Sequence, residues 1–181
     1  SQKKKSHFQK NLKVLKFDLK KRIIPKLECD VFIHIAGITP QKIHSKKDFN
    51  EINFSSLKSI IKKINIKKKL IFLSTTDVYK NQNYSKPVNE NLKIDHSKIS
   101  NYAKSKYYGE IFLKSLNKKK YNFQKLVLRL PGIVGNNNHP NFISNLIQNT
   151  ILKKDFIYYG RDNLFNNIYH VDTLSNLIKE L

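Results

Sequence analysis

The sequence predicts an α/β protein built on a doubly wound parallel sheet. Four short apolar runs rich in Val, Ile, Leu and Phe are typical of parallel strands that are buried on both faces. They occupy Leu12–Phe17, Val31–Ala36, Leu70–Ser74 and Leu126–Leu130. Longer amphipathic stretches separate the runs, and strands that alternate with helices favour a parallel sheet with helices on both sides.

The amphipathic stretches place the helices. Phe49–Ile64 repeats isoleucine and leucine at helical spacing, so it is expected to form a helix. Further helices are expected at Ile99–Leu116, Asn141–Leu152 and Asp172–Leu181. Short strands are expected at Phe156–Tyr159 and Asn167–His170, while residues 1–10 are expected to form a loop or a frayed helix.

Composition limits the class of protein. The 181 residues suffice for one domain, and 39% of them are hydrophobic. The formal net charge is +22, but nearly all of the basic residues are lysines scattered along the chain, which favours a solvated surface over a specific nucleic-acid site. Cys29 is the single cysteine, and no apolar run approaches the ~20 residues of a membrane helix. No signal peptide is expected. A soluble, cytoplasmic protein without a membrane partner is expected.

Two side chains in the second helical stretch, Ile99–Leu116, carry the main chemical signal. Tyr102 and Lys106 are four residues apart, so they share one face of a helix. A free phenol has a pKa near ~10, and a neighbouring cation favours its ionised form and allows proton exchange with a substrate hydroxyl. The hydroxyl of Thr75, at the end of a predicted strand, can hold the same substrate oxygen.

Six segments with family-like sequence follow one another in a definite order. They are Leu15–Leu19, Asp30–Gly37, Leu70–Thr75, Tyr102–Glu110, Leu128–Gly135 and Ile168–Asp172. Together they resemble the NAD-dependent epimerase/dehydratase family, the extended branch of the short-chain dehydrogenase/reductase superfamily, which works on nucleotide sugars. The resemblance implies a Rossmann-like fold and either NAD or NADP as cofactor.

The resemblance also implies roles for single residues. Tyr102 would be the catalytic acid/base, Thr75 would bind the reacting oxygen, and Lys106 would hold the nicotinamide ribose and lower the pKa of Tyr102. The cofactor would be bound by Asp18, Leu19, Ala36, Gly37, Asn53, Ser74, Tyr102, Lys106 and Pro131. The alternative readings are a turn-capping role for Asp18, a purely structural role for Asn53 and a strand-ending role for Pro131. The six histidines show no metal-ligand spacing, so no metal site is expected.

One family element has no match in the sequence. The five glycines form no Gly-x-x-Gly-x-x-Gly loop, the motif that lets a backbone approach a pyrophosphate. We therefore expect an internal fragment, with 1–135 as a partial dinucleotide-binding domain that begins just before the third strand and 136–181 as the start of a substrate-binding region. Without the first two strands, Leu12–Phe17 lacks a natural partner and Val31–Ala36 becomes an apolar edge. Marginal stability and weak cofactor binding are expected of such a fragment alone.

The expected function is hydride transfer between a nucleotide sugar and nicotinamide. Family dehydratases place Asp-Glu after the catalytic threonine, whereas Thr76 and Asp77 stand here, so epimerisation or reduction of a 4-keto sugar fits better than dehydration. Asn166-Asn167 stand where the family often has Arg-Asp for the substrate diphosphate. The alternatives are a non-catalytic dinucleotide-binding relative and a basic nucleic-acid-binding protein. The resemblance also implies a homodimer through the helices 49–64 and 99–116.

Overall fold

The chain forms two parallel sheets with helices packed around them. The computed structural model describes residues 12–21, 23–40, 42, 44–81, 88–136, 142–155 and 168–181. The first sheet has the order β1-β2-β3 and the second pairs β4 with β5. The strands are β1 (Leu27–His34), β2 (Ile64–Thr75), β3 (Gln124–Leu130), β4 (Gly132–Val134) and β5 (Ile168–His170). The helices are α1 (Lys46–Asp48), the π-helix η1 (Phe49–Ser55), α2 (Ser56–Lys63), the 3-10 helix η2 (Thr76–Tyr79), α3 (Asn101–Ser115), α4 (Phe142–Ile151) and α5 (Val171–Glu180).

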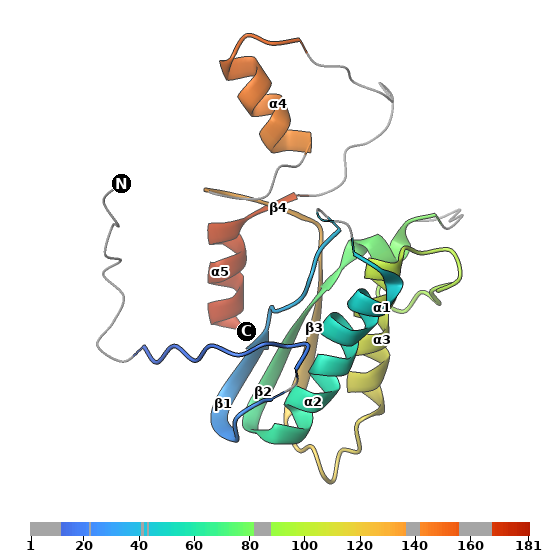
Figure 1. Cartoon of the computed structure of the whole chain (residues 1–181), viewed down its shortest axis with the longest axis vertical. Helices are drawn as coiled ribbons and strands as arrows, with labels where there is room; N and C mark the ends of the chain where they lie inside the picture. Colours follow the sequence, from blue (N-terminus) through green and yellow to red (C-terminus); the bar gives the residue numbers. More distant parts are fainter. Residues whose placement is uncertain are drawn as a thin grey trace.

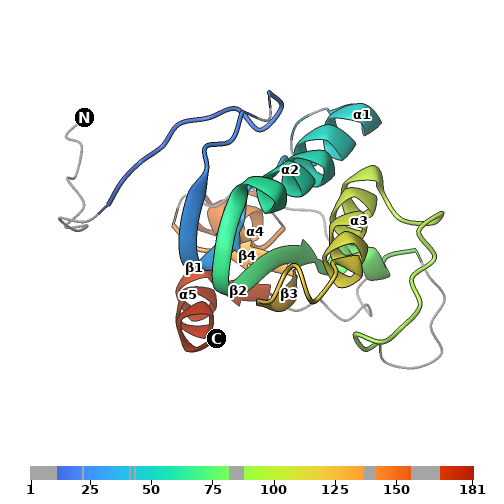
Figure 2. The same cartoon turned by 90° about the horizontal axis from the view of Figure 1, so that it is seen from below.

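Helices lie on both sides of the three-stranded sheet. Figures 1 and 2 show α1, α2 and α3 on one face and α5 on the opposite side. The predicted doubly wound, Rossmann-like fold is therefore confirmed, and so are the predicted strands and helices of this sheet from β1 onward. Within the described part of the chain, no helix is long and apolar enough to cross a membrane.

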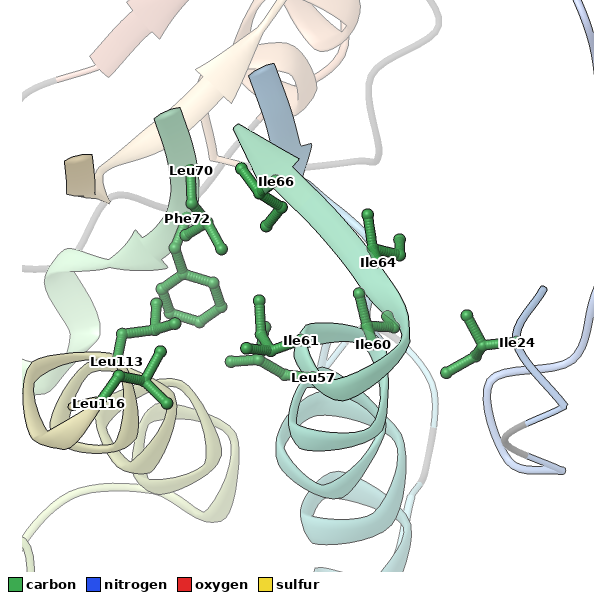
Figure 3. Packing of buried hydrophobic residues seen from close by; sticks show 10 residues of the cluster. All are labelled: Ile24, Leu57, Ile60, Ile61, Ile64, Ile66, Leu70, Phe72, Leu113 and Leu116. Carbon is green, nitrogen blue, oxygen red and sulfur yellow. The ribbon is translucent and has the colours of Figure 1, made fainter. Parts of the chain in front are cut away.

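The core lies between β2 and the pair of helices α2 and α3. Figure 3 shows aliphatic side chains of α2 turned toward the Phe72 ring of β2, with leucines of α3 closing the other side. The largest side chains that are completely enclosed there are Leu57, Leu70, Phe72 and Leu113. Burial of each such side chain stabilises the fold by about 1.5–3 kcal/mol. This core fixes α3, and with it Tyr102, against the sheet.

The helical stretch before β2 contains a π-helical turn. Its start is capped by Ser45, whose hydroxyl accepts from the backbone amide of Asp48 at 3.1 Å, while the Asp48 carboxylate accepts from the Ser45 amide. The π segment Phe49–Ser55 then widens the helix, a distortion that occurs most often at functional sites. Phe49 and Asn53 are the two residues of this segment that are buried, so it presents them to the site described below.

Some expectations differ from the structure or lie outside the described residues. The predicted strand Leu12–Phe17 is wrong, because residues 12–18 form no strand and have no neighbouring strand to pair with. The elements η2 and β4 were not predicted, since each is too short to show a periodic pattern. Phe156–Tyr159 lies outside the described residues. The boundary at residue 135 stays a prediction, and β4 before it pairs with β5 after it.

Strand β1 is the outer strand of the three-stranded sheet. Among the described residues it pairs with β2 alone, and its apolar side chains Val31 and Ile33 are 47% and 39% exposed. The expected apolar edge is thus present. An edge of this kind offers unpaired backbone groups and apolar surface to a second chain.

We expect Val31→Glu to reduce self-association of the protein roughly threefold, because charge on an edge strand discourages strand pairing. The new carboxylate would face Lys69, which is the partner of Val31 in β2, so the unfolding free energy should change by less than ~1 kcal/mol. Light scattering against protein concentration measures the effect. Val14→Glu, at an exposed position outside the sheet, is the control, and an equal reduction in that variant would rule out the edge as the cause.

Candidate active site

The three predicted catalytic residues meet where β2 ends against α3. Thr75 is the last residue of β2 and the capping residue of η2. Its hydroxyl accepts from the backbone amide of Asp77 at 3.1 Å. Tyr102 and Lys106 lie on successive turns of α3. Ser100 caps the start of this helix, and its hydroxyl accepts from the amide of Ala103 at 3.1 Å. The carboxyl ends of parallel strands are the usual place for ligand sites in this fold.

Tyr102 is held between an aromatic ring and a hydroxyl. Its ring meets the buried Phe49 edge to face at a centroid distance of 6.0 Å. Burial and the nearby Asp77 carboxylate raise the pKa of Tyr102, while a side-chain hydrogen bond with Thr75 acts in the opposite direction. Lys106 is not among the causes of this shift, so its expected lowering of the Tyr102 pKa stays a prediction, and in the free protein the phenol is protonated at neutral pH.

Lys106 is a buried cation. Its side chain is 5% exposed, and its Nζ donates to the backbone carbonyl of Leu73 at 3.0 Å and lies 5.3 Å from the centre of the Phe72 ring. Burial lowers the pKa of Lys106 to about 8, because the charged form loses hydration that one carbonyl and one ring do not replace. The ammonium has further N–H groups that can donate hydrogen bonds to a ligand hydroxyl.

Asn53 ties the loop after β1 to α3. Its Oδ1 accepts from the amide of Ile38 at 2.7 Å, and its Nδ2 donates to the Ile38 carbonyl and to Ser105 Oγ, both at 3.0 Å. A Cβ atom on Gly37 would lie 2.8 Å from Asn53 Oδ1 and 3.6 Å from Lys106 Nζ. Only glycine therefore lets the loop approach Asn53 this closely, which makes Asn53 a structural clamp for the predicted cofactor floor.

The other predicted cofactor residues occupy different surroundings. Ala36 and Gly37 are exposed beside Asn53, and Pro131 lines a pocket of about 830 Å³ between β3 and α5. Ser74 is buried, and its hydroxyl donates to Glu110. Asp18 accepts from the backbone amide of Lys20 at 2.8 Å, which is the turn-capping reading of this residue, and Leu19 packs partly against the core.

Several buried polar residues beside the site were not assigned a role from the sequence. Glu110 and Arg129 lie in the motifs that carry the family resemblance, but nothing in their spacing shows that they form a buried ion pair, at 2.6 Å. His34 stacks on Phe72 at a centroid distance of 5.6 Å, and its Nε2 is buried without a hydrogen-bond partner. The signal that could have found Glu110 is its position one helical turn beyond Lys106.

The residues present fit the hydroxyl-rich end of a dinucleotide. Lys106 has donors to spare, and the exposed Ala36 and Gly37 leave the backbone beside it open. Among the glycines of the sequence none forms the loop that would cradle a pyrophosphate. Among the described residues, no group of three or more His, Cys, Asp or Glu side chains is placed to hold a metal ion.

The sequence matches one protein family over most of its length. Residues 1–172 fit the family model described as the NAD dependent epimerase/dehydratase family. The chain belongs to this family. No curated protein sequence matches the chain closely enough to count as a relative.

Solved structures of similar fold include nucleotide-sugar epimerases. One is the UDP-glucuronic acid 4-epimerase of Bacillus cereus in complex with NAD, at 22% identity and a TM-score of 0.64, covering 90% of this chain and 53% of the enzyme. Another is the UDP-N-acetylglucosamine 4-epimerase of Methanobrevibacter ruminantium in complex with UDP-N-acetylmuramic acid, at 23% identity and a TM-score of 0.68. The match covers 88% of this chain and 52% of the enzyme. A third is RMD of Pseudomonas aeruginosa complexed with NADPH, at 20% identity and a TM-score of 0.69. The match covers 91% of this chain and 61% of that protein. At these identities the likeness establishes the fold, and the chain spans between half and two thirds of their length.

We expect Lys106→Met to raise the free energy of unfolding at pH 7 by roughly 2 kcal/mol, because it removes a poorly solvated charge at the cost of one hydrogen bond. The pKa of Lys106 falls from 10.5 unfolded to about 8 folded, so the penalty is complete below about pH 8. The wild type regains this stability as the pH rises through 10.5, and the difference between the two proteins should vanish there.

Denaturant unfolding at several pH values from 7 to 10.5 measures the difference. Lys104→Met is the matched control on the same helix, at a position that is not buried, and it should show no such dependence on pH. A Lys106→Met protein that is less stable than the wild type at pH 7 would contradict the account of a strained buried cation.

Proposed function

We propose that this chain supplies the tyrosine-bearing part of an NAD(P)-dependent enzyme that epimerises or reduces a nucleotide sugar. The observation that carries the proposal is the grouping of Thr75, Tyr102 and Lys106 at the carboxyl end of β2, in a chain of the epimerase/dehydratase family. The neighbouring enzymes solved with NAD, NADPH or a UDP-sugar support the choice of cofactor and substrate class.

The protonation states of Tyr102 and Lys106 favour a role of Tyr102 as a proton donor. Burial and Asp77 raise the pKa of Tyr102, so its hydroxyl is protonated at neutral pH, and Lys106, with a pKa of about 8, is mainly an ammonium. Tyr102 would give its proton to the oxygen of a keto-sugar, and Thr75 would hold that oxygen. Lys106 would stabilise the phenolate that remains. The bound nicotinamide would supply or accept the hydride. The same groups run in reverse when a sugar hydroxyl is oxidised.

The two residues after Thr75, which are Thr76 and Asp77, make dehydration the less favoured reaction. The Thr76 hydroxyl donates to the carbonyl of Leu130 at 3.4 Å, and the Asp77 carboxylate pairs with Lys80 at 2.7 Å. A hydroxyl cannot act as the acid that the family dehydratases carry there, and the Asp77 side chain is one methylene shorter than the glutamate that they use as a base. These contacts support epimerisation or simple reduction.

The assignments for the whole protein follow from the same family membership. We propose that residues 1–135 belong to the dinucleotide-binding domain and that 136–181 begin the substrate-binding region. Cytoplasmic location fits the single cysteine, Cys29, which stays unpaired. We propose no specific nucleic-acid partner.

The outer face of the two long helical segments supports a homodimer. Phe54 of η1 forms a surface aromatic cluster with Tyr108 and Phe112 of α3, at centroid distances of 5.9 and 6.4 Å. Beside it, Ile111 is 47% exposed. Aromatic and aliphatic side chains that gather on a helix surface are typical of the centre of an interface.

If this face joins two copies, Ile111→Glu should weaken the dimer at least tenfold, because it places a charge in the apolar centre of the interface. Sedimentation velocity over a range of concentrations measures the change. Ile147→Glu alters an equally exposed isoleucine on α4 and should leave the assembly unchanged. A wild-type protein that is monomeric at high concentration would refute the dimer.

Replacement of the acid/base is the direct test of the enzymatic proposal. We expect Tyr102→Phe to lower kcat by roughly 100-fold or more on UDP- or dTDP-4-keto sugars and sugars with a free 4-hydroxyl, because the phenylalanine ring has no hydroxyl proton to donate. Product formation is followed by NMR and nicotinamide binding by fluorescence. Tyr107→Phe on the same helix is the control. Binding without turnover that Tyr102→Phe leaves unchanged would instead support a non-catalytic relative.

A further inference from the structure

A buried polar network lies directly behind the proposed catalytic residues. Glu110 of α3 is 8% exposed, and its carboxylate receives the hydroxyl of Ser74 and three N–H contacts from Arg129, of which the shortest is 2.6 Å. Arg129 in turn donates from Nη1 to the Tyr79 hydroxyl at 2.5 Å, with its guanidinium 5.0 Å from the centre of that ring. The network therefore joins β2, η2, α3 and β3.

The network completes a ladder between α3 and the end of β2. Tyr102, Lys106 and Glu110 are spaced four apart, so they share one helix face. Lys106 bonds to the carbonyl of Leu73, and Glu110 accepts from Ser74. The residue that follows, Thr75, has its hydroxyl beside the Tyr102 phenol, where it acts to lower the pKa of that group. Three consecutive residues of β2 are thus tied to three successive turns of α3.

A ladder of this kind determines both the rotation of α3 and its position along the strand. Four residues of helix span about 6 Å, whereas a hydrogen bond tolerates changes of only a few tenths of an ångström. A small rotation of α3 that the apolar core would accept would therefore break the Tyr102–Thr75 contact. Stability alone does not require charges here, because an apolar pair of the same volume commonly holds a core as well as a buried ion pair does.

We propose that Glu110 and Arg129 are positioning residues that hold Tyr102 in register with Thr75. They do not touch the reacting atoms, and they act through Ser74 and Tyr79. This role rests on the proposed function insofar as it concerns turnover. The alignment of Tyr102 itself is a property of the free protein and can be measured without a substrate.

A pair of substitutions separates positioning from stability. Glu110→Met together with Arg129→Leu removes both charges and keeps apolar volume, so the double variant should unfold close to the wild-type midpoint, while Glu110→Met alone leaves the Arg129 charge unpaired and should unfold well below it. Ser74→Ala deletes only the hydroxyl that links Glu110 to β2. Lys114→Met, at an exposed position of α3, is the control.

The readout is the ¹³Cζ resonance of Tyr102 as a function of pH in tyrosine-labelled protein, identified by its absence in Tyr102→Phe. We expect the double variant and Ser74→Ala to shift this resonance and its titration midpoint, and to lower kcat about tenfold with KM within about twofold. Lys114→Met should match the wild type in every measurement.

Two results would overturn the positioning role. One is a folded double variant with the wild-type Tyr102 resonance and, where turnover exists, the wild-type kcat. The other is a Tyr102 resonance that is unchanged in Ser74→Ala, which applies even if the double variant does not fold. A wild-type protein without turnover would count against the proposed enzyme, and the resonance would still decide whether the network aligns Tyr102.

Discussion

Helix α3 approaches β2 so closely at Gly109 that any side chain there would overlap the Phe72 ring, since a Cβ would lie 2.8 Å from its Cζ. Glycine inside a helix costs about 1 kcal/mol relative to alanine, and here that loss permits the contact. The same approach brings Lys106 within hydrogen-bonding distance of the β2 backbone and buries Glu110 against Ser74. The geometry of the site depends on this contact between a helix and a strand.

The price of this closeness is a poorly solvated cation in the middle of the fold. Lys106 is enclosed by Phe72, Leu73 and the loop at Gly37, and no carboxylate is among the causes of its shifted pKa. A buried charge without a carboxylate partner lowers the stability of the fold relative to an apolar side chain at the same position. Such a loss of stability is common where function needs a preformed polar group. The nearby side chains of Glu110 and Arg129, in contrast, neutralise each other in an ion pair.

Local patterns predicted the framework of this chain and part of its site. The runs that became β1, β2 and β3 were visible because parallel strands buried on both faces are uniformly apolar, and α3 was visible from its spacing and from Tyr102 with Lys106. Leu12–Phe17 was mispredicted because a strand needs a partner as well as an apolar sequence.

The remaining features of the site depend on contacts between distant segments. The direction of the Tyr102 pKa shift depends on burial and on Asp77, and the clamp at Asn53 depends on Ile38 and Ser105. No local pattern encodes these distances, so the sequence could name the residues but could not predict their protonation or their partners.

The order of strands in the main sheet is the same in space as along the chain. β1 pairs with β2, and β2 pairs with β3, each time across one helical connection. Among these three strands none has to be inserted between two that have already paired, so each strand–helix–strand unit can close as soon as it has been synthesised. Synthesis from the amino toward the carboxyl end therefore delivers the three strands in the order in which they pair.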